Sequence, residues 1–288
     1  MTNSILTHEH IVKFQTKIWD YFNQQGRDFP WRKTTDPYAI MVSEFMLQQT
    51  QTMRVCQKYE VWLDRFPTVQ SVADATLADV LSMWNGLGYN RRAKFLHKTC
   101  QNICLYYDGL VPCDAKELDT LPGIGAYTAR AICTFAFNKP EVFIETNIRS
   151  VFIKHFFTQQ QPDDNHLSNT LISDADILAL VEQTLDRQNP RGWYYALMDY
   201  GAFIKKSEEN PSRKSRSYSK QSTFKGSLRQ ARGAILRQLS RQEKTGISLE
   251  EIAAKENIDM ERLDKAADYL TKENMIYSSN GQYFFSEK

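Results

Sequence analysis

The chain has 288 residues, of which 42% are hydrophobic, and a formal net charge of +2 at pH 7. This length and composition allow one large or two smaller domains with a full core. No apolar run approaches the ~20 residues needed to span a bilayer, and residues 1–14 are too polar for a signal peptide, so we expect a cytoplasmic protein with no membrane partner.

Helical periodicity dominates the chain from residue 8 to about residue 203 and predicts a mostly α fold. The first amphipathic helix is expected over residues 11–21, and Asp36 and Pro37 have the N-cap and first-position residue types of a helix start. Further helices are expected over residues 51–66, 77–85, 90–107, 126–137, 146–157, 174–187 and 193–204, with a polar loop over 159–169.

Glu44 lies inside residues 38–47, a predicted helix that is apolar on nearly every side. We therefore expect its carboxyl group to be buried. Desolvation raises the pKa of a carboxyl group, and a proton held near neutral pH makes a general acid. The alternative is a structural glutamate with a buried partner.

Two segments have residue types suited to nucleic-acid contact. Polar residues follow the Glu44 helix directly, namely Gln48, Gln49, Thr50 and Gln51. Amides at a helix end can reach base edges, but the segment could also be an ordinary polar turn. A glycine-hinged turn leads into a basic helix through Gly86, Gly88, Tyr89 and Arg91. It suits backbone contact with phosphates and equally a plain loop.

Residues 121–129 read as a hairpin between two helices. A helical run over 115–121 stops at Pro122, and Gly123 and Gly125 supply tight backbone conformations before the next helix. The bare N–H groups of that helix start suit a DNA phosphate. An ordinary helix–helix connection is the alternative.

Glu145 stands where an apolar run joins the next predicted helix. A helix N-terminus favours an ionised carboxylate. One protonated and one ionised carboxyl group is the division of labour that breaks glycosidic bonds. Taken alone, Glu145 could equally be a common helix-terminal acid.

The rest of the chain is basic and then changes pattern. Within residues 205–241 only Glu208 and Glu209 oppose many lysines and arginines, which indicates either a polyanion contact or a solvated linker. Helices over 226–242, 248–257 and 260–274 precede a hairpin signal at Asn280 and Gly281, which together predict a winged helix that binds DNA or protein. We expect domains at 1–204 and 224–288, joined by a linker at 205–223.

These features occur together in one family. The chain resembles the helix-hairpin-helix (HhH-GPD) DNA glycosylases, and most closely their adenine-specific branch, over residues 8–240. The resemblance rests on five segments, namely Phe29-Pro30-Trp31-Arg32, residues 43–51, residues 84–89, residues 121–129 and Asp199-Tyr200-Gly201-Ala202. It implies the two-lobed helix-hairpin-helix fold, here with a C-terminal winged-helix-like domain.

The resemblance also implies roles. Glu44 matches the general acid, Glu145 stands where the family has an aspartate that stabilises the sugar cation, and Asn147 matches an asparagine of that segment. Tyr127 replaces the nucleophilic lysine of lyase members, so AP-lyase activity should be weak or absent. The implied reaction is monofunctional excision of adenine opposite oxidised guanine or guanine from a flipped-out nucleotide.

Four departures from the family pattern matter, and three of them concern the active site and the recognition of DNA. Glu145 is one methylene longer than aspartate, Asn90 replaces a second aromatic residue after Gly88, and the tail replaces the domain that reads oxidised guanine in long members. The alternatives are a thymine or uracil mismatch glycosylase of the same fold and a catalytically impaired DNA-binding protein. In each case the expected partner is double-stranded DNA with a mismatched or damaged base, bound by a nucleoid-associated monomer.

The family often holds an iron–sulfur cluster through four cysteines. The corresponding positions here carry Lys205, Ser212, Ser215 and about Gln221, so no cluster is expected. None of the five cysteines follows Cys133, and they have no paired spacing typical of zinc sites or disulfide frameworks, so we expect buried free thiols and no metal ligands. The resemblance leaves open a monovalent cation at the Gly123–Gly125 turn.

Overall fold

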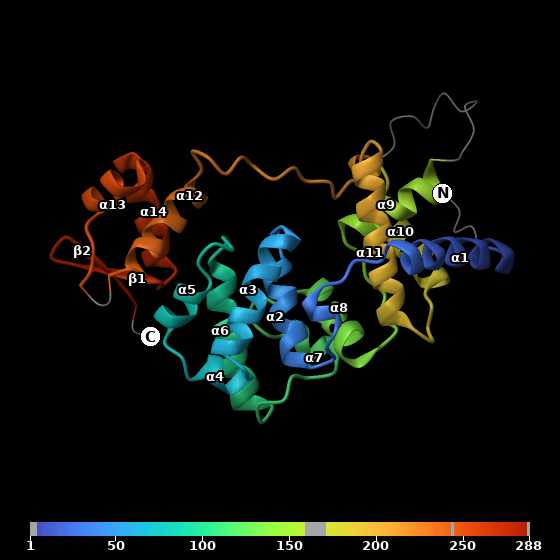
Figure 1. Cartoon of the computed structure of the whole chain (residues 1–288), viewed down its shortest axis with the longest axis horizontal. Coiled ribbons are helices and arrows are strands. Elements are labelled where there is room, and N and C mark those ends of the chain that lie inside the picture. The colour runs from blue at the N-terminus through green and yellow to red at the C-terminus, as the bar shows by residue number, and fades with distance from the viewer. Residues whose placement is uncertain (1–4, 159–170, 243–244, 287–288) are drawn as a thin grey trace. The chain divides into compact units, whose positions relative to one another are not determined.

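The computed structural model describes residues 5–158, 171–242 and 245–286. The chain is mostly helical, as predicted (Figure 1). It forms two compact units. Unit 1 comprises Met1–Thr35, Cys113–Lys116 and Gly125–Lys220, and unit 2 comprises Asp36–Pro112, Glu117–Ile124 and Gln221–Lys288. The polar loop expected over 159–169 lies outside the described residues. Within the described ranges, no helix is both long and apolar enough to cross a membrane.

Unit 1 is built on two packed helices, α9 and α11. Its elements are α1 (His8–Gln25), η1 (Pro30–Arg32), α8 (Ala126–Phe137), α9 (Thr146–Phe152), a π-helical turn η2 (Ile153–Phe157), α10 (Asp174–Thr184), α11 (Pro190–Ser207) and η3 (Pro211–Lys214). The short helix α7 (Ala115–Asp119) contributes residues to both units. Helix α11 packs against α9 and α1, and the fully buried Trp193 and Phe152 lie in this core, in ring contact with Phe14.

The bounds of α10 and α11 in unit 1 differ from the sequence expectation. Helix α10 ends at Thr184 rather than at residue 187. The Asp186 carboxylate accepts hydrogen bonds from the backbone N–H groups of Gln188 and Asn189 (3.0 and 3.1 Å), which favours a turn over a further helical turn. Asn189 then caps α11, which runs on to Ser207 inside the expected linker.

A buried ion pair links η1 to α11 in unit 1. The Arg32 guanidinium donates to both carboxylate oxygens of Asp199 (2.8 and 2.7 Å), and the side chain and backbone of Arg27 add two more hydrogen bonds. Burial opposes ionisation of Asp199, but these hydrogen bonds and positive charges hold the pKa of its carboxyl group below the ordinary value. Two motifs far apart in sequence thereby fix η1 against α11.

The helical part of unit 2 surrounds an aromatic core. It comprises α2 (Pro37–Leu47), α3 (Thr52–Arg65), α4 (Val69–Ala73), α5 (Leu77–Met83) and α6 (Arg91–Tyr106). Trp62 and Trp84 are fully buried and meet edge to face, and the Tyr38 hydroxyl donates to the Phe66 carbonyl (2.7 Å). Helix α4 was not predicted, because it has only five residues and is defined by a reciprocal cap between Thr68 and Ser71.

The tail of unit 2 has the predicted winged-helix element order. Helices α12 (Leu228–Leu239), α13 (Leu249–Glu256) and α14 (Met260–Lys272) precede a hairpin of β1 (Ile276–Ser279) and β2 (Gln282–Phe285), coloured orange to red in Figure 1. Asn280 and Gly281 both have positive φ (50° and 76°), as a two-residue hairpin turn requires. An antiparallel bridge from Ile247 to Tyr283 extends this small sheet.

The five cysteines divide by environment. Cys100 and Cys133 are buried free thiols, as expected, and burial raises the pKa of both. Cys113 is exposed, and the other two are half-buried. The expectation of buried thiols is therefore wrong for Cys113, which lies in the loop before α7 and has no helix face to bury it.

Candidate functional site

Helix α2 carries the buried carboxyl group that the sequence predicted. The Asp36 side chain accepts from the Tyr38 N–H (3.1 Å), Pro37 takes the first helical position, and every residue from 38 to 46 is buried. Glu44 retains only 6% of its accessible surface. A carboxyl group on such a helix is costly unless it is compensated, so its presence needs a specific reason.

The polar residues after α2 form a sharp connection to α3. Gln48 caps the C-terminus of α2, Gln49 adopts a left-handed backbone conformation (φ 55°), and Gln51 caps the N-terminus of α3. The Thr50 hydroxyl is within 3.2 Å of the Leu87 carbonyl, in the glycine-hinged turn. Tertiary packing therefore brings the two sequence-predicted contact segments together in unit 2.

Arg92 joins these segments and was missed as a structural residue by the sequence reasoning. Its guanidinium donates to the carbonyls of Phe45 and Met46 (2.7 and 2.8 Å) at the end of the Glu44 helix. It also donates to the Thr50 hydroxyl (2.8 Å) and the Gly88 carbonyl (2.9 Å). Burial lowers the pKa of Arg92 to about 10. Only its place in the first turn of α6, after a glycine-hinged turn, could have pointed to this role.

The hairpin at residues 121–129 only partly matches the expectation. Gly123 has φ 77°, and a Cβ there would lie 2.6 Å from Phe95 Cβ, so both conformation and space require glycine. Gly125 has an extended backbone (φ −103°) with open space around it. The expectation that its conformation excludes a side chain is therefore wrong. Gly125 is the N-cap of α8, where the absence of a side chain leaves the helix N–H groups accessible.

Glu145 is the N-cap of α9. Its Oε1 accepts from the backbone N–H groups of Asn147 and Ile148 (2.8 and 2.9 Å), and its Oε2 accepts from the Asn147 side-chain amide (3.2 Å). Loss of hydration raises the pKa of this carboxyl group, although these amides and the positive charges of Lys205 and Arg149 act in the opposite direction. Both carboxylate oxygens of Glu145 thus accept hydrogen bonds at the N-terminus of α9, Oε1 from the backbone and Oε2 from the Asn147 side chain.

Tyr127 lies in the first turn of α8. Its ring packs edge-on against Phe143 (5.6 Å between centroids), which in turn stacks on Tyr194 (3.8 Å). The Tyr194 hydroxyl donates to the Glu141 carbonyl (2.8 Å) and so fixes the chain that leads to Glu145. The tyrosine at position 127 is thus part of the aromatic packing that supports this segment.

The loop where the resemblance places cluster ligands is closed by polar contacts instead. Ser212 and Ser215 are buried, and their hydroxyls donate to Asn210 Oδ1 (2.7 Å) and Asp174 Oδ1 (3.5 Å). Lys205 Nζ donates to Asn147 Oδ1 (3.2 Å). An ammonium group and two hydroxyls do not fit an iron–sulfur cluster, which needs thiolates. In the described ranges, no three His, Cys, Asp or Glu side chains form a group that could hold a metal ion.

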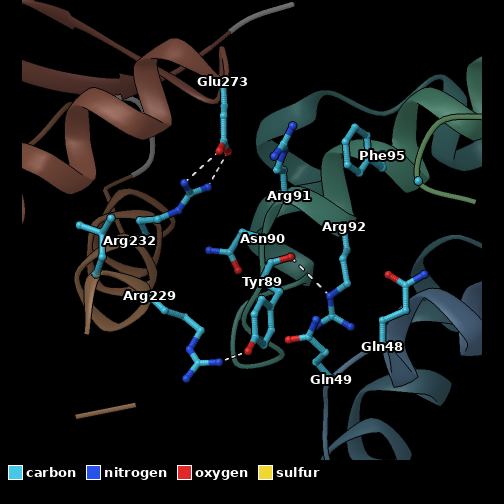
Figure 2. A pocket seen from close by; sticks show the side chains of 12 residues that line it. Gln48, Gln49, Tyr89, Asn90, Arg91, Arg92, Phe95, Arg229, Arg232 and Glu273 are labelled. Atoms are coloured by element: carbon cyan, nitrogen blue, oxygen red, sulfur yellow. Dashed lines mark hydrogen bonds and ion pairs between the residues drawn. The ribbon is translucent and has the colours of Figure 1, made fainter. Parts of the chain in front are cut away.

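A pocket of about 440 Å³ lies within unit 2 beside the glycine-hinged turn (Figure 2). Its walls come from the segments already described and from the tail. The helical part of unit 2 supplies Gln48, Gln49, Tyr89, Asn90, Arg91, Arg92, Phe95 and Gly123. The tail supplies Leu228, Arg229, Arg232 and Glu273. Five of the ten contact residues predicted from the sequence line this pocket, namely Gln48, Gln49, Tyr89, Arg91 and Gly123, and the buried Asn90 lies beside them.

The family profile of the HhH-GPD superfamily base excision DNA repair proteins matches residues 42–173, which include Glu44, the glycine hairpin and Glu145. Residues 42–173 of the chain are therefore similar to this superfamily. A second profile, that of the replication protein A C terminal, matches residues 202–280.

Curated proteins similar to this chain include adenine DNA glycosylases. The Mycobacterium tuberculosis enzyme is 38% identical over 190 residues, which are 66% of this chain and 60% of that protein. The Mycolicibacterium smegmatis enzyme is 45% identical over 136 residues (47% and 46%), and the human enzyme is 32% identical over 203 residues (67% and 36%). The match to this chain spans only about 60% of the length of the first of these relatives.

Solved structures support the same HhH-GPD fold. A thermostable thymine-DNA glycosylase aligns with a TM-score of 0.60 at 25% identity, over 72% of this chain and 92% of that one. An endonuclease III trapped as a covalent intermediate with DNA aligns with a TM-score of 0.52 at 21% identity, over 69% and 86%.

Proposed function

We propose that this protein is a monofunctional adenine DNA glycosylase that acts on adenine opposite guanine or oxidised guanine in double-stranded DNA. The observation that carries the proposal is the buried carboxyl group of Glu44, on a largely apolar helix that is followed by Gln48. The similarity to adenine DNA glycosylases across 66% of the chain supports the choice of base. We expect the active form to be a monomer.

In the proposed reaction, Glu44 supplies a proton to the departing base. The glycosidic bond then breaks with its electron pair leaving on the protonated base, and the sugar acquires oxocarbenium character. The Glu145 carboxylate stabilises that positive charge, and Asn147 holds the carboxylate through its side-chain amide. Water adds to the sugar carbon and loses a proton, which leaves an apurinic site.

We propose little or no AP-lyase activity. A lyase needs an amine that attacks the sugar carbon and forms a Schiff base, and Tyr127 offers none at the position where lyase members have lysine. We also propose that the enzyme works without an iron–sulfur cluster, since Lys205, Ser212 and Ser215 are committed to hydrogen bonds. Purified protein should be colourless, and stoichiometric iron by elemental analysis would contradict this.

A thymine or uracil mismatch glycosylase is the second candidate. The alignment with a thymine-DNA glycosylase over 92% of that chain favours this candidate. The fold alone does not select the excised base, so the shared fold is compatible with both candidates. Both candidates assign the same task to Glu44, so the substrate must decide between them.

One experiment separates the candidates. The purified chain is incubated with end-labelled duplexes that contain A opposite 8-oxoguanine, A opposite G, T opposite G or U opposite G, and each reaction is analysed with and without hot alkali. Strand breaks confined to A-containing strands after alkali support the proposal. Breaks in T or U strands support the second candidate, and breaks without alkali would contradict the monofunctional reaction. Binding without any excision would indicate an impaired enzyme.

A further inference from the structure

The pocket in unit 2 has one wall that belongs to the C-terminal tail and not to the segments matched by the superfamily profile. Leu228, Arg229 and Arg232 come from the first turns of α12, and Glu273 follows α14. Figure 2 shows Arg229 directed at the hydroxyl of Tyr89, which lies on the glycine-hinged turn. The tail therefore contributes directly to the surface that carries Gln48 and Gln49.

Arg229 and Tyr89 form a specific contact. Arg229 Nη1 donates to the Tyr89 hydroxyl, and the guanidinium carbon lies 4.7 Å from the centroid of the Tyr89 ring. The Gln221 side chain donates to the same hydroxyl. Tyr89 adopts φ 47°, a left-handed conformation that costs an L-residue energy, so the surrounding contacts must hold it there.

Among the four arginines of the pocket, Arg229 and Arg91 retain capacity for a ligand. Arg232 is paired with both oxygens of Glu273 (3.0 and 2.5 Å), and the Arg92 guanidinium is occupied by backbone carbonyls and the Thr50 hydroxyl. Arg229 Nη1 donates to the Tyr89 hydroxyl and Nη2 to the Ser222 carbonyl (2.9 Å), which leaves one further N–H on each of these two nitrogens. Arg91 lies over the Phe95 ring at 5.3 Å.

The pocket therefore presents mainly donors. Its amides belong to Gln48, Gln49 and Asn90, its charged donors are guanidinium groups, and its one carboxylate, Glu273, is already paired. Such a lining selects a ligand rich in acceptors. Guanine presents two acceptors, O6 and N7, on one edge and matches a guanidinium fork, whereas cytosine presents a donor there. The rings of Tyr89 and Phe95 add apolar surface to this lining.

We propose that Arg229 is a specificity-determining residue that reads a guanine opposite the excised base, with Tyr89 as its positioning partner. The inference rests on the proposed function, because it assumes that the bound duplex carries a mismatch. It assigns to the tail of this chain a part in substrate choice that the helical segments alone would not supply.

The test uses the full chain and duplexes that contain an uncleavable abasic-site analogue opposite G, C or T, with affinity measured by fluorescence anisotropy. This readout does not require base excision. A wild-type preference for G together with no adenine excision would count against the proposed function and leave this inference standing.

We expect Arg229→Ala to reduce the preference for G over C by roughly tenfold. Arg229→Lys keeps the charge but not the fork, so it should lose the preference while keeping the salt dependence of binding. Tyr89→Phe keeps the ring and removes the hydroxyl acceptor. It should lower the preference, and its effect should vanish in the Arg229→Ala background, since the two residues act together.

Arg241→Ala is the matched control, because Arg241 lies just beyond α12 and outside the pocket. It should leave the preference unchanged. A wild-type chain without preference for G would overturn the inference. The inference would also be overturned if Arg229→Ala lowered the affinity for all duplexes by the same factor and made that affinity less dependent on salt concentration. Such a result indicates a phosphate contact and not base recognition.

Discussion

Gly201 on α11 lies against the backbone of Asn147 on α9, and a Cβ at Gly201 would be 2.2 Å from the Asn147 carbonyl oxygen. No side chain fits there, so only glycine lets α9 approach α11 this closely. Glu145 caps the same end of α9. The position of the proposed sugar-stabilising carboxylate therefore depends on the absence of a side chain at Gly201 on α11.

Gly201→Ala should displace the N-terminus of α9. We expect a loss of about 1–3 kcal/mol in the free energy of unfolding from overpacking. We also expect a fall in excision rate of roughly a hundredfold, because a shift of about 1 Å is enough to misplace a catalytic group. Gly233→Ala is the control: Gly233 lies in α12 with open space around it, so alanine should raise stability slightly. Equal behaviour of the two variants in thermal melts would contradict the explanation.

Glu44→Gln should abolish excision and leave folding and DNA binding nearly intact. The amide has the size of the carboxyl group but cannot donate an acidic proton, so we expect a loss of about 10²–10⁴ in the single-turnover rate. Glu60→Gln, at an exposed position on α3 of the same unit, is the control and should excise normally. Retained excision by Glu44→Gln would remove the proposed general acid.

Lys205→Met should change the pH dependence of excision. Burial raises the pKa of Glu145, and the positive charge of Lys205 limits that rise together with Arg149. Without Lys205 the pKa rises further, so Glu145 stays ionised only at higher pH and the acidic limb of the rate profile moves to higher pH. The adjacent, exposed Lys206→Met serves as control. An unshifted limb with a uniformly lower rate would indicate that Lys205 acts only through packing.

Asp199→Asn should destabilise the protein most at neutral pH. Removing one member of a buried ion pair costs about 3–5 kcal/mol, because Arg32 is left without its carboxylate. The pKa of Asp199 is lower in the folded state, so its contribution is present above the unfolded pKa of about 4 and is lost as the pH falls through the folded pKa. The difference in the free energy of unfolding between wild type and variant, measured by urea titration, should therefore become smaller as the pH is lowered. Glu209→Gln, in an exposed pair with Arg213, should show almost no gap at any pH.

Arg92→Lys should unfold unit 2 more readily. A lysine cannot serve both the α2 carbonyls and the Gly88 carbonyl, so buried acceptors lose their partners at a cost of about 3 kcal/mol. Arg91→Lys, at the neighbouring exposed position, should melt like the wild type. Equal melting of the two variants would show that the Arg92 hydrogen bonds contribute little to stability.

Local sequence was sufficient where short-range rules govern the backbone. The burial of Glu44 follows from the apolar residues on either side of it, the cap role of Glu145 from its place before a helix, and the hairpin at Asn280 from the Asn-Gly pair. The predicted helix over 174–187 is too long at its C-terminus. Hydrogen bonds from the backbone N–H groups of Gln188 and Asn189 to the Asp186 side chain favour a turn there, and helical periodicity does not register them.

The sequence by itself determined the helical periodicity, the buried acid on α2 and the order of elements in the tail, because each depends on neighbours within one or two turns. Only the tertiary structure decided which charged groups meet. Arg32 finds Asp199 at a separation of 167 residues, and Arg229 finds Tyr89 at a separation of 140. The partner of a long charged side chain is set by the packing of whole helices, and no local pattern encodes that choice.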